Sequence, residues 1–369
     1  MRTWTGGADA RALAALETYE FTIIPRVTGI FNGVDIGTFD IIDGTYTSDE
    51  TSEVRDRCDV TFAVPDVKDP SVFDPSVLDV VGYRFRVEIG VVLNNTTTYV
   101  TLGTFVVYNR TESESATGRT ITLEGYDVTV LVRDADFETL YLVGATTPFN
   151  TAIAAIISQI GLDTVIPTTT FSTPMLLFEE GTKRLETVRN MALSCGWEVL
   201  ATPDGKVWVR PLKGVASSVW DFVEGDGCRM TDIGRTRTRQ GVYNIARVSG
   251  EASGTTTASA TAYDNDPKSP TYATDTTQGP FGRVPIFQKS QFITTTAQAQ
   301  AAANALILSK KGIAAAISIT AFTNPALEVG DTVHVVRSRF SINKTIPLKS
   351  LSIPLNPGKL MTVTTREAA

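Results

Sequence analysis

The sequence predicts a β-rich protein of the α+β class. Short runs that alternate apolar and polar residues, separated by Gly, Asp and Asn, recur over residues 19–137 and again after residue 316, as is typical of antiparallel strands. Between these blocks lies a helical pattern that is followed at once by a tight hairpin, over residues 181–211. The chain has 369 residues, of which 42% are hydrophobic, so it is long enough for two or three domains of ordinary size.

The first block of strands, residues 15–137, is expected to form the first domain. Alternation begins at 19–24, returns at 60–64, and becomes continuous from Tyr83. Asn94-Asn95 predicts a hairpin turn within that last run, and a further strand begins at Ile121. Three or more strands joined by short turns are what an antiparallel barrel or sandwich needs.

The middle unit, residues 138–215, is expected to combine helices with a hairpin. A helix should begin at Thr147-Pro148 and end at Gly161, because four isoleucines between them share one helical face: Ile153, Ile156, Ile157 and Ile160. A second helix follows, with Thr182 as its cap and Gly196 as its end. Pro203-Asp204-Gly205 then turns two strands back on each other.

The last unit, residues 216–369, is expected to be a second strand-rich domain. Residues 249–280 contain no Val, Ile, Leu, Met, Phe or Trp, so we expect a long mobile loop there. An alanine-rich helix should follow over residues 296–311, capped by Thr294 or Thr295 and ended by Gly312. The remaining alternating runs predict the closing strands.

Charge is distributed unevenly along the chain. The net charge is −7, but residues 1–232 carry 33 acidic and 18 basic side chains, a balance of −15, whereas the rest carries 7 and 15, a balance of +8. Arg235, Arg237 and Arg239 would share one strand face and are candidate interface residues toward an acidic neighbouring subunit. The simpler interpretation is that each surface is merely solvated.

Little in the sequence favours catalysis, and we expect no enzyme activity and no cofactor. The single histidine, His334, lies within an alternating strand, and no GxSxG or phosphate-binding glycine loop is present. Glu179-Glu180 could suggest a carboxylate pair for glycoside cleavage, but adjacent residues of an extended segment point apart. A solvated loop explains this pair better.

No metal site is predicted either. Cys58, Cys195 and Cys228 are odd in number and far apart, so we expect buried free thiols. Asp264-Asn265-Asp266, with Asp275 nearby, could offer oxygen ligands to Ca²⁺, but the spacing does not match an EF-hand. Residues 1–20 lack an apolar core behind a basic start, and no window reaches the about 20 apolar residues of a membrane span, so no membrane anchor is expected.

Three segments in this order carry a resemblance to a known family: GYDVTVLVRDADF (125–137), the helix and hairpin of 181–211, and NPALEVGDTV (324–333). Together they resemble the tail hub proteins of tailed phages, which are similar to the baseplate hub of contractile tails, the base of the type VI secretion spike and the tail-associated protein of siphophages. In the last segment Pro325 and Gly330 should set a turn that leads into a strand. The resemblance implies two small antiparallel β-barrels with the helix-containing unit inserted between them.

The same resemblance implies a structural virion protein at the tail tip, assembled in the host cytoplasm. Three copies would form a ring that joins the tail tube to the tip. Its partners would then be the tail tube protein, the distal tail protein, the tape-measure protein and a tip or spike protein. Arg235, Arg237 and Arg239 could alternatively contact DNA or the tape-measure helices in the lumen through charge alone.

Two other functions are weighed against this one. A carbohydrate-binding or receptor-recognition module would be expected to gather exposed aromatic side chains, whereas the four tryptophans are scattered, at Trp4, Trp197, Trp208 and Trp220. A cell-wall hydrolase would need a carboxylate dyad or a metal cluster, and the sequence offers no clear candidate.

Overall fold

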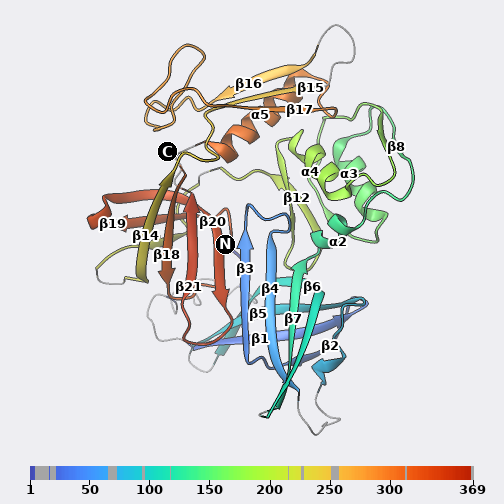
Figure 1. Ribbon diagram of the computed structural model, residues 1–369, viewed down its shortest axis with the longest axis vertical. Helices are drawn as coiled ribbons and strands as arrows, with labels where there is room; N and C mark the ends of the chain where they lie inside the picture. Colours follow the sequence, from blue (N-terminus) through green and yellow to red (C-terminus); the bar gives the residue numbers. More distant parts are fainter. Residues whose placement is uncertain are drawn as a thin grey trace.

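The computed structural model describes residues 1–4, 16, 22–64, 73–93, 96–116, 118–214, 216–225, 228–250, 257–311 and 314–366. Strands dominate this part of the chain, as the sequence predicts. They form a 13-stranded sheet, two three-stranded sheets and a two-stranded sheet, and four α-helices accompany them among the described residues (Figure 1). None of these helices is both long and apolar enough to cross a membrane.

The 13-stranded sheet contains strands from both strand-rich blocks of the sequence. Its members are β1 (Thr22–Phe31), β2 (Val34–Phe39), β3 (Asp43–Asp49), β4 (Asp56–Val64), β5 (Tyr83–Leu93), β6 (Thr96–Ser115), β7 (Gly118–Asp127), β13 (Trp220–Phe222), β14 (Met230–Thr238), β18 (Ala314–Ala321), β19 (Thr332–Arg337), β20 (Ile342–Pro354) and β21 (Met361–Arg366). Two short 3₁₀ turns, Pro75–Val77 and Ser338–Phe340, lie in its connections.

One strand pair joins the two blocks. The strand order is β14-β18-β21-β20-β3-β4-β7-β6-β5-β1-β2, and β20 pairs antiparallel with β3, from Ser350 opposite Asp49 to Pro354 opposite Thr45. The two blocks therefore share one continuous sheet instead of forming two separate ones. Among the described strands, β14 and β2 at the two ends of this path are not paired with each other, so the pairing does not close the sheet into a barrel.

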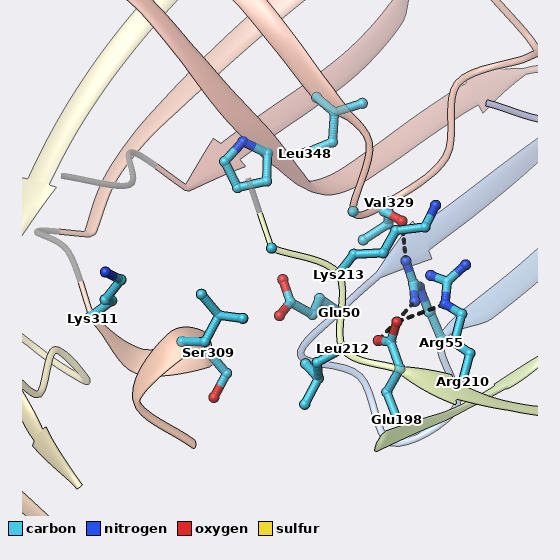
Figure 2. A pocket seen from close by; sticks show the side chains of 14 residues that line it. Glu50, Arg55, Glu198, Arg210, Leu212, Lys213, Ser309, Lys311, Val329 and Leu348 are labelled. Carbon is cyan, nitrogen blue, oxygen red and sulfur yellow. Dashed lines mark hydrogen bonds and ion pairs between the residues drawn. The ribbon is translucent and has the colours of Figure 1, made fainter. Parts of the chain in front are cut away.

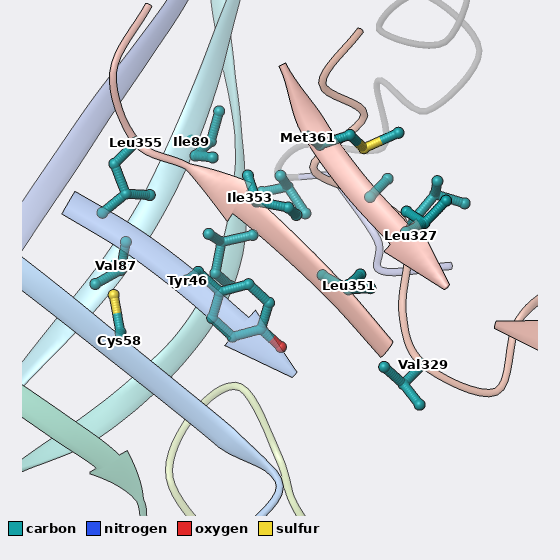
Figure 3. Packing of buried hydrophobic residues seen from close by; sticks show 14 of the residues in the cluster. Tyr46, Cys58, Val87, Ile89, Leu327, Val329, Leu351, Ile353, Leu355 and Met361 are labelled. Carbon is teal, nitrogen blue, oxygen red and sulfur yellow. The ribbon is translucent and has the colours of Figure 1, made fainter. Parts of the chain in front are cut away.

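The core of this sheet is filled by large side chains from both blocks (Figure 3). Phe85 and Phe105 pack with ring centroids 5.6 Å apart, and Tyr46 lies 6.0 Å from Phe105. Leu351 and Ile353 of β20 belong to the same buried cluster. Because the core is continuous across the β3–β20 pair, packing and hydrogen bonding tie the two halves together.

The middle unit has the predicted helices and hairpin. Its elements are β8 (Tyr141–Val143), α3 (Phe149–Ser158), β9 (Thr164–Val165), β10 (Leu176–Phe178), α4 (Arg184–Leu193), β11 (Trp197–Ala201) and β12 (Val207–Pro211). Helix α2 (Thr129–Asp134), which precedes the unit in the chain, packs in the same core. The isoleucine stripe of α3 faces a core of its own, and Gly161 takes a positive φ of 71° where that segment ends. Gly205 has a φ of 84° in the turn between β11 and β12, as the predicted hairpin requires.

The predicted cap of α4 is wrong. Lys183, not Thr182, is the residue before the helix, and no side-chain cap hydrogen bond is present. Arg184, the first residue of α4, is buried instead. Its Nε donates to the carbonyl of Ala135 at 3.0 Å and its Nη1 donates to Gln159 Oε1 at 2.6 Å. Contacts across the unit thus hold this end of the helix in place of a local cap.

In the last unit, the structure contains a small sheet where part of a long loop was predicted. β15 (Ile245–Gly250), β16 (Ser259–Tyr263) and β17 (Pro285–Ser290) form a three-stranded sheet that packs on α5 (Thr296–Lys310). Part of 249–280 is therefore a strand, because its small alanines pack closely on the alanine-rich helix and do not need large apolar side chains. Residues 251–256 lie outside the described part, and the mobility of the segment stays a prediction.

Helix α5 begins as predicted. The Thr295 hydroxyl accepts from the Gln298 amide at 3.2 Å, while Gln298 Oε1 accepts from the Thr295 amide at 3.0 Å. This reciprocal pair is a capping box. The predicted stop at Gly312 and the predicted turn at Asn94-Asn95 lie outside the described residues, although β5 and β6 pair on either side of that turn.

Candidate functional site

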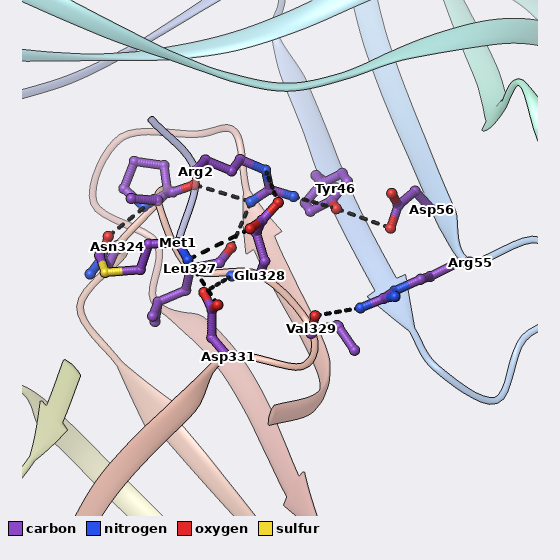
Figure 4. Close-up of polar contacts among 12 residues, drawn as sticks. Met1, Arg2, Tyr46, Arg55, Asp56, Asn324, Leu327, Glu328, Val329 and Asp331 are labelled. Carbon is purple, nitrogen blue, oxygen red and sulfur yellow. Dashed lines mark hydrogen bonds and ion pairs between the residues drawn. The ribbon is translucent and has the colours of Figure 1, made fainter. Parts of the chain in front are cut away.

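The turn predicted within NPALEVGDTV is present, and a charged junction is built around it (Figure 4). Asn324 Oδ1 accepts from the Ala326 amide at 3.1 Å, and Asp331 Oδ2 accepts from the Glu328 amide at 2.9 Å. Gly330 adopts a φ of 89°, which favours glycine, and its amide bonds to the Leu348 carbonyl at 2.8 Å. The turn therefore presents its carbonyls and carboxylates at a defined place beside β19.

Arg2 links this turn to β3 and β4. Its Nη1 donates to the Leu327 carbonyl at 2.6 Å, and its Nη2 donates to the Tyr46 hydroxyl at 2.6 Å. The Tyr46 hydroxyl in turn donates to Asp56 Oδ1 at 3.1 Å. The guanidinium of Arg2 also lies 5.0 Å from the centroid of the Tyr46 ring. A single side chain thus connects the second strand block to the first.

Electrostatics support this arrangement. Burial opposes the charge of Arg2, but Tyr46, Glu328 and nearby carboxylates outweigh it and raise the pKa of Arg2. Burial also opposes the charge of Glu328, yet Arg2 and the terminal amine of Met1 hold its pKa below the usual range. The amine of Met1 lies 2.8 Å from Asp331 Oδ1. Opposite charges are therefore buried together and neutralise one another.

A second connection joins the hairpin of the middle unit to the same turn (Figure 2). Arg55, just before β4, donates to the carbonyl of Val329 and lies 3.8 Å from Glu198. Glu198 Oε1 accepts from Nε of Arg210, directly across the β11–β12 hairpin, at 2.8 Å. The three parts of the fold therefore meet at one cluster of alternating charges.

Among the described residues that line the pocket beside this cluster, no charged side chain is without a partner. The pocket is lined by residues of the hairpin, of the turn and of the end of α5. Lys213 lies 3.8 Å from Asp331, and Lys311 lies 3.2 Å from Asp264, so both lysines of the lining have anionic partners. Among the described residues, no group of three or more His, Cys, Asp or Glu side chains could hold a metal ion. The geometry suits a structural junction.

Asp127 connects the large sheet to the middle unit. Its Oδ1 accepts from the amide of Thr129 at 2.7 Å at the start of α2, and its Oδ2 accepts from the amide of Asp56 at 3.0 Å in β4. Burial, followed by the nearby Asp56 carboxylate, raises the pKa of Asp127 to about 6. The charge of this carboxylate therefore changes under mildly acidic conditions.

The predicted arginine row is only partly formed. Arg235 and Arg237 lie on β14 two residues apart and so share a face, with Arg237 exposed. Arg239 lies beyond the strand, where its Nη2 donates to the carbonyl of Phe281 at 2.8 Å and its guanidinium lies 4.5 Å from the Phe281 ring centroid. The row therefore contains two arginines, because the strand ends before the third.

The residues weighed for catalysis lie far apart in the fold. His334 is on β19, with its Nε2 2.8 Å from Asn343 Oδ1 on β20. Glu179 and Glu180 are exposed just after β10, in the middle unit. β19 belongs to the 13-stranded sheet and β10 to a separate two-stranded sheet, so strand pairing does not bring the glutamates beside the histidine.

The residues weighed as metal ligands have other partners. Asp264 is fully buried and accepts from the hydroxyls of Ser269 and of Thr271, the latter at 2.6 Å. It also pairs with Lys311. Asp275 accepts instead from the Tyr263 hydroxyl, at 3.1 Å. Hydrogen bonds thus occupy both carboxylates.

The cysteines are free, as expected, but their burial is only partly as expected. Cys58 is buried, which raises the pKa of its thiol, whereas Cys195 and Cys228 are only half-buried.

Sequence reasoning missed the junction residues Arg2, Tyr46, Arg55, Glu198 and Arg210. Only the last pair had a usable signal. A turn at 203–205 sets the hairpin register, and that register places Glu198 opposite Arg210. Arg2 and Arg55 contact residues 325 and 274 positions away, and Tyr46 contacts Arg2, 44 positions away, so no local pattern reveals them.

Comparisons with known proteins identify the fold. No family model matches the chain, and no curated protein matches it in sequence. A solved tail protein from Neisseria meningitidis is similar to it, with a TM-score of 0.61 and 15% identity over 93% of this chain and 97% of that one. A 43 kDa tail protein of prophage MuSo2 from Shewanella oneidensis has a TM-score of 0.60 and 11% identity, over 93% and 98% of the two chains.

A third similar structure is a Francisella PdpA-VgrG complex, with a TM-score of 0.54 and 9% identity over 97% of this chain. The match covers 55% of the Francisella chain, so this protein spans about half of its length. The expected resemblance therefore holds at the level of the fold. The chain has the fold shared by phage tail proteins and a chain of a VgrG complex.

Proposed function

We propose that this protein is a structural tail hub that forms a trimeric ring joining a tail tube to its tip. The observation that carries the proposal is the extent of the fold match: 93% of this chain aligns with 97% of a tail protein from Neisseria meningitidis. The charged junction supports it, because paired charges connect the three parts of the chain. We propose that the protein is not an enzyme.

The proposal includes finer points of organisation and assembly. We propose the division 15–137, 138–215 and 216–369, with the first and last parts as two barrel-like halves of the continuous sheet. The partners would be the tail tube, distal tail and tape-measure proteins and a tip or spike protein. The similarity to a chain of the Francisella PdpA-VgrG complex supports tail or spike partners in general. The protein would be assembled in the host cytoplasm and would end at the tail tip of the virion.

Arg235 and Arg237 are proposed as part of a contact with an acidic neighbouring surface. Their strand, β14, lies at one end of the strand order and pairs on one side only, with β18, among the described strands. A row of arginines on an edge strand also disfavours uncontrolled edge pairing, so a specific acidic partner would be needed to cover it.

Mass photometry and sedimentation equilibrium of the purified chain test the trimer. One copy has a mass of 39.8 kDa, so a closed ring of three gives about 120 kDa. We expect the trimer to form at high concentration or on addition of the tail tube protein. A monomer or a dimer that persists under both conditions would contradict the proposal.

A further inference from the structure

An apolar patch lies on the outer face of the ribbon formed by β8 and β10. Leu142 and Leu177 are directly opposite each other in this two-stranded pair, and they are 53% and 50% exposed. Leu140 and Met175 occupy the next outward positions and are 64% and 69% exposed. Four large apolar side chains therefore form one exposed group, whereas single exposed apolar residues are ordinary.

The ribbon beneath this patch is firmly supported. On its inner face, the Phe137 ring stacks on Phe178 at a centroid distance of 5.2 Å and on Tyr141 at 5.5 Å. The guanidinium of buried Arg184 lies 4.3 Å from the Phe137 centroid. The inner residues are buried in the core of the middle unit. The outward leucines are therefore held in place by packed rings below.

Acidic residues border the patch. Glu138, Glu179 and Glu180 are exposed at the ends of the two strands, next to Leu140. Lys183 is also near this end, but its Nζ pairs with Asp136 at 2.8 Å. The patch thus combines an apolar centre with negative charge at one end, and a partner would need an apolar group with positive charge beside it.

The same molecule carries a surface of that kind. The inner face of the sheet β16–β15–β17 packs on α5, and its outer face carries Arg247, Phe287 and Lys289. Phe287 lies directly opposite Arg247 in the register and is 69% exposed, while Arg247 and Lys289 are exposed too. The three strands contain no Asp or Glu. This face is therefore an exposed phenylalanine between two cations.

We infer that the β8–β10 ribbon of one copy docks on the outer face of β16–β15–β17 of the next copy. Each copy offers one surface of each kind, so the contact is heterologous and closes into a ring when the rotation allows it. Figure 1 shows β8 and the β15–β17 sheet in separate parts of the molecule, which leaves both for neighbours. The inference rests on the proposed ring and names the surfaces that would hold it together.

A charge swap tests this pairing. The acidic-side variant is E138K/E179K, the basic-side variant is R247E/K289E, and the swap combines all four changes in one chain. Each half variant places like charges opposite each other, so we expect the dissociation constant of the oligomer to rise by at least about tenfold. The swap restores opposite charges and should return it to within about threefold of the wild type.

The control is Glu114→Lys, an equally exposed glutamate near the end of β6, which should leave assembly unchanged. Sedimentation equilibrium gives the constants, and circular dichroism confirms that each variant is folded. A wild-type trimer that all variants form equally well would overturn this docking and leave the hub proposal standing. The docking would be overturned as well if both half variants weaken assembly and the swap does not restore it. A wild type that never assembles would overturn the ring and this contact together.

Discussion

The core of the 13-stranded sheet is filled by aromatic and long aliphatic side chains, whereas the sheet β16–β15–β17 meets α5 largely through alanines. In the first region Phe85, Phe105 and Tyr46 pack ring against ring. In the second, the cluster combines five alanines with four larger aliphatic residues: Ala246, Ala262, Ala299, Ala302 and Ala303, with Val248, Ile293, Leu306 and Ile307. One region gains stability mainly from buried area, and the other from the close approach of backbones.

This difference explains why composition misleads in the second region. A segment without large apolar residues is expected to remain disordered because it buries too little surface. Here, small residues let the strands lie close to the helix. A Cβ atom added at Gly250 would lie 2.1 Å from the Ile293 carbonyl oxygen. Small size is thus a packing requirement in this region.

The largest expected effect comes from truncating the aromatic core. Phe105→Ala should lower the free energy of unfolding by about 3–5 kcal/mol, because a fully buried ring leaves a cavity among Tyr46 and Phe85. Phe340→Ala is the matched control, since it removes the same side chain from a position that is 44% exposed and lies outside the proposed docking surfaces, and it should change stability by less than about 0.5 kcal/mol. Urea denaturation measures both. Equal decreases in the free energy of unfolding for the two variants would contradict the expected difference between the buried and the exposed ring.

Next in size is the pH dependence that Asp127 introduces at the edge of the large core. The pKa of Asp127 is raised from 3.8 to about 6, so the folded state disfavours its ionised form. Its contribution to stability is therefore present below pH 4 and is lost as the pH rises through 6, by up to about 3 kcal/mol. The two buried carboxylates differ in their neighbours: Asp264, in the other region, is paired with the cation of Lys311, whereas Asp127 lies near the carboxylate of Asp56.

The measurement compares the wild type with Asp127→Asn from pH 4 to pH 7. Asparagine changes the hydrogen bonds by a constant amount but does not titrate. The stability of the wild type relative to the variant should therefore fall between pH 4 and pH 6 and then level off. Parallel curves across this range would mean that Asp127 keeps an ordinary pKa.

The smallest expected effect is overpacking of the alanine interface. Ala303→Leu should cost about 1–3 kcal/mol, because Ala303 is fully buried between α5 and the sheet. Ala297→Leu, at an exposed position of the same helix, is the control and should be close to neutral. Hydrogen exchange should accelerate at β15–β17 and stay unchanged in the large sheet. Faster exchange in both regions would show that they unfold as one unit.

The contacts of the candidate site are harder to predict from the sequence than the helices and the hairpin. The turn at Pro325 and Gly330 was predicted, and so was the hairpin that carries Glu198 and Arg210. The contacts that join them were not, because Arg2 and Arg55 have no feature that distinguishes them from other surface arginines in the sequence. Their role appears only when distant strands meet.

What the sequence determined by itself is local. Periodic apolar residues, a threonine cap at 294 or 295 and the glycines at 161 and 205 specify the helices and the tight turn, because these interactions span only a few residues. The tertiary structure alone decided that β20 pairs with β3, that Arg2 reaches the turn of 324–331, and that the alanines of β16 pack on α5. These outcomes depend on which surfaces fit together across some 300 residues, and shape complementarity of that kind has no local signature.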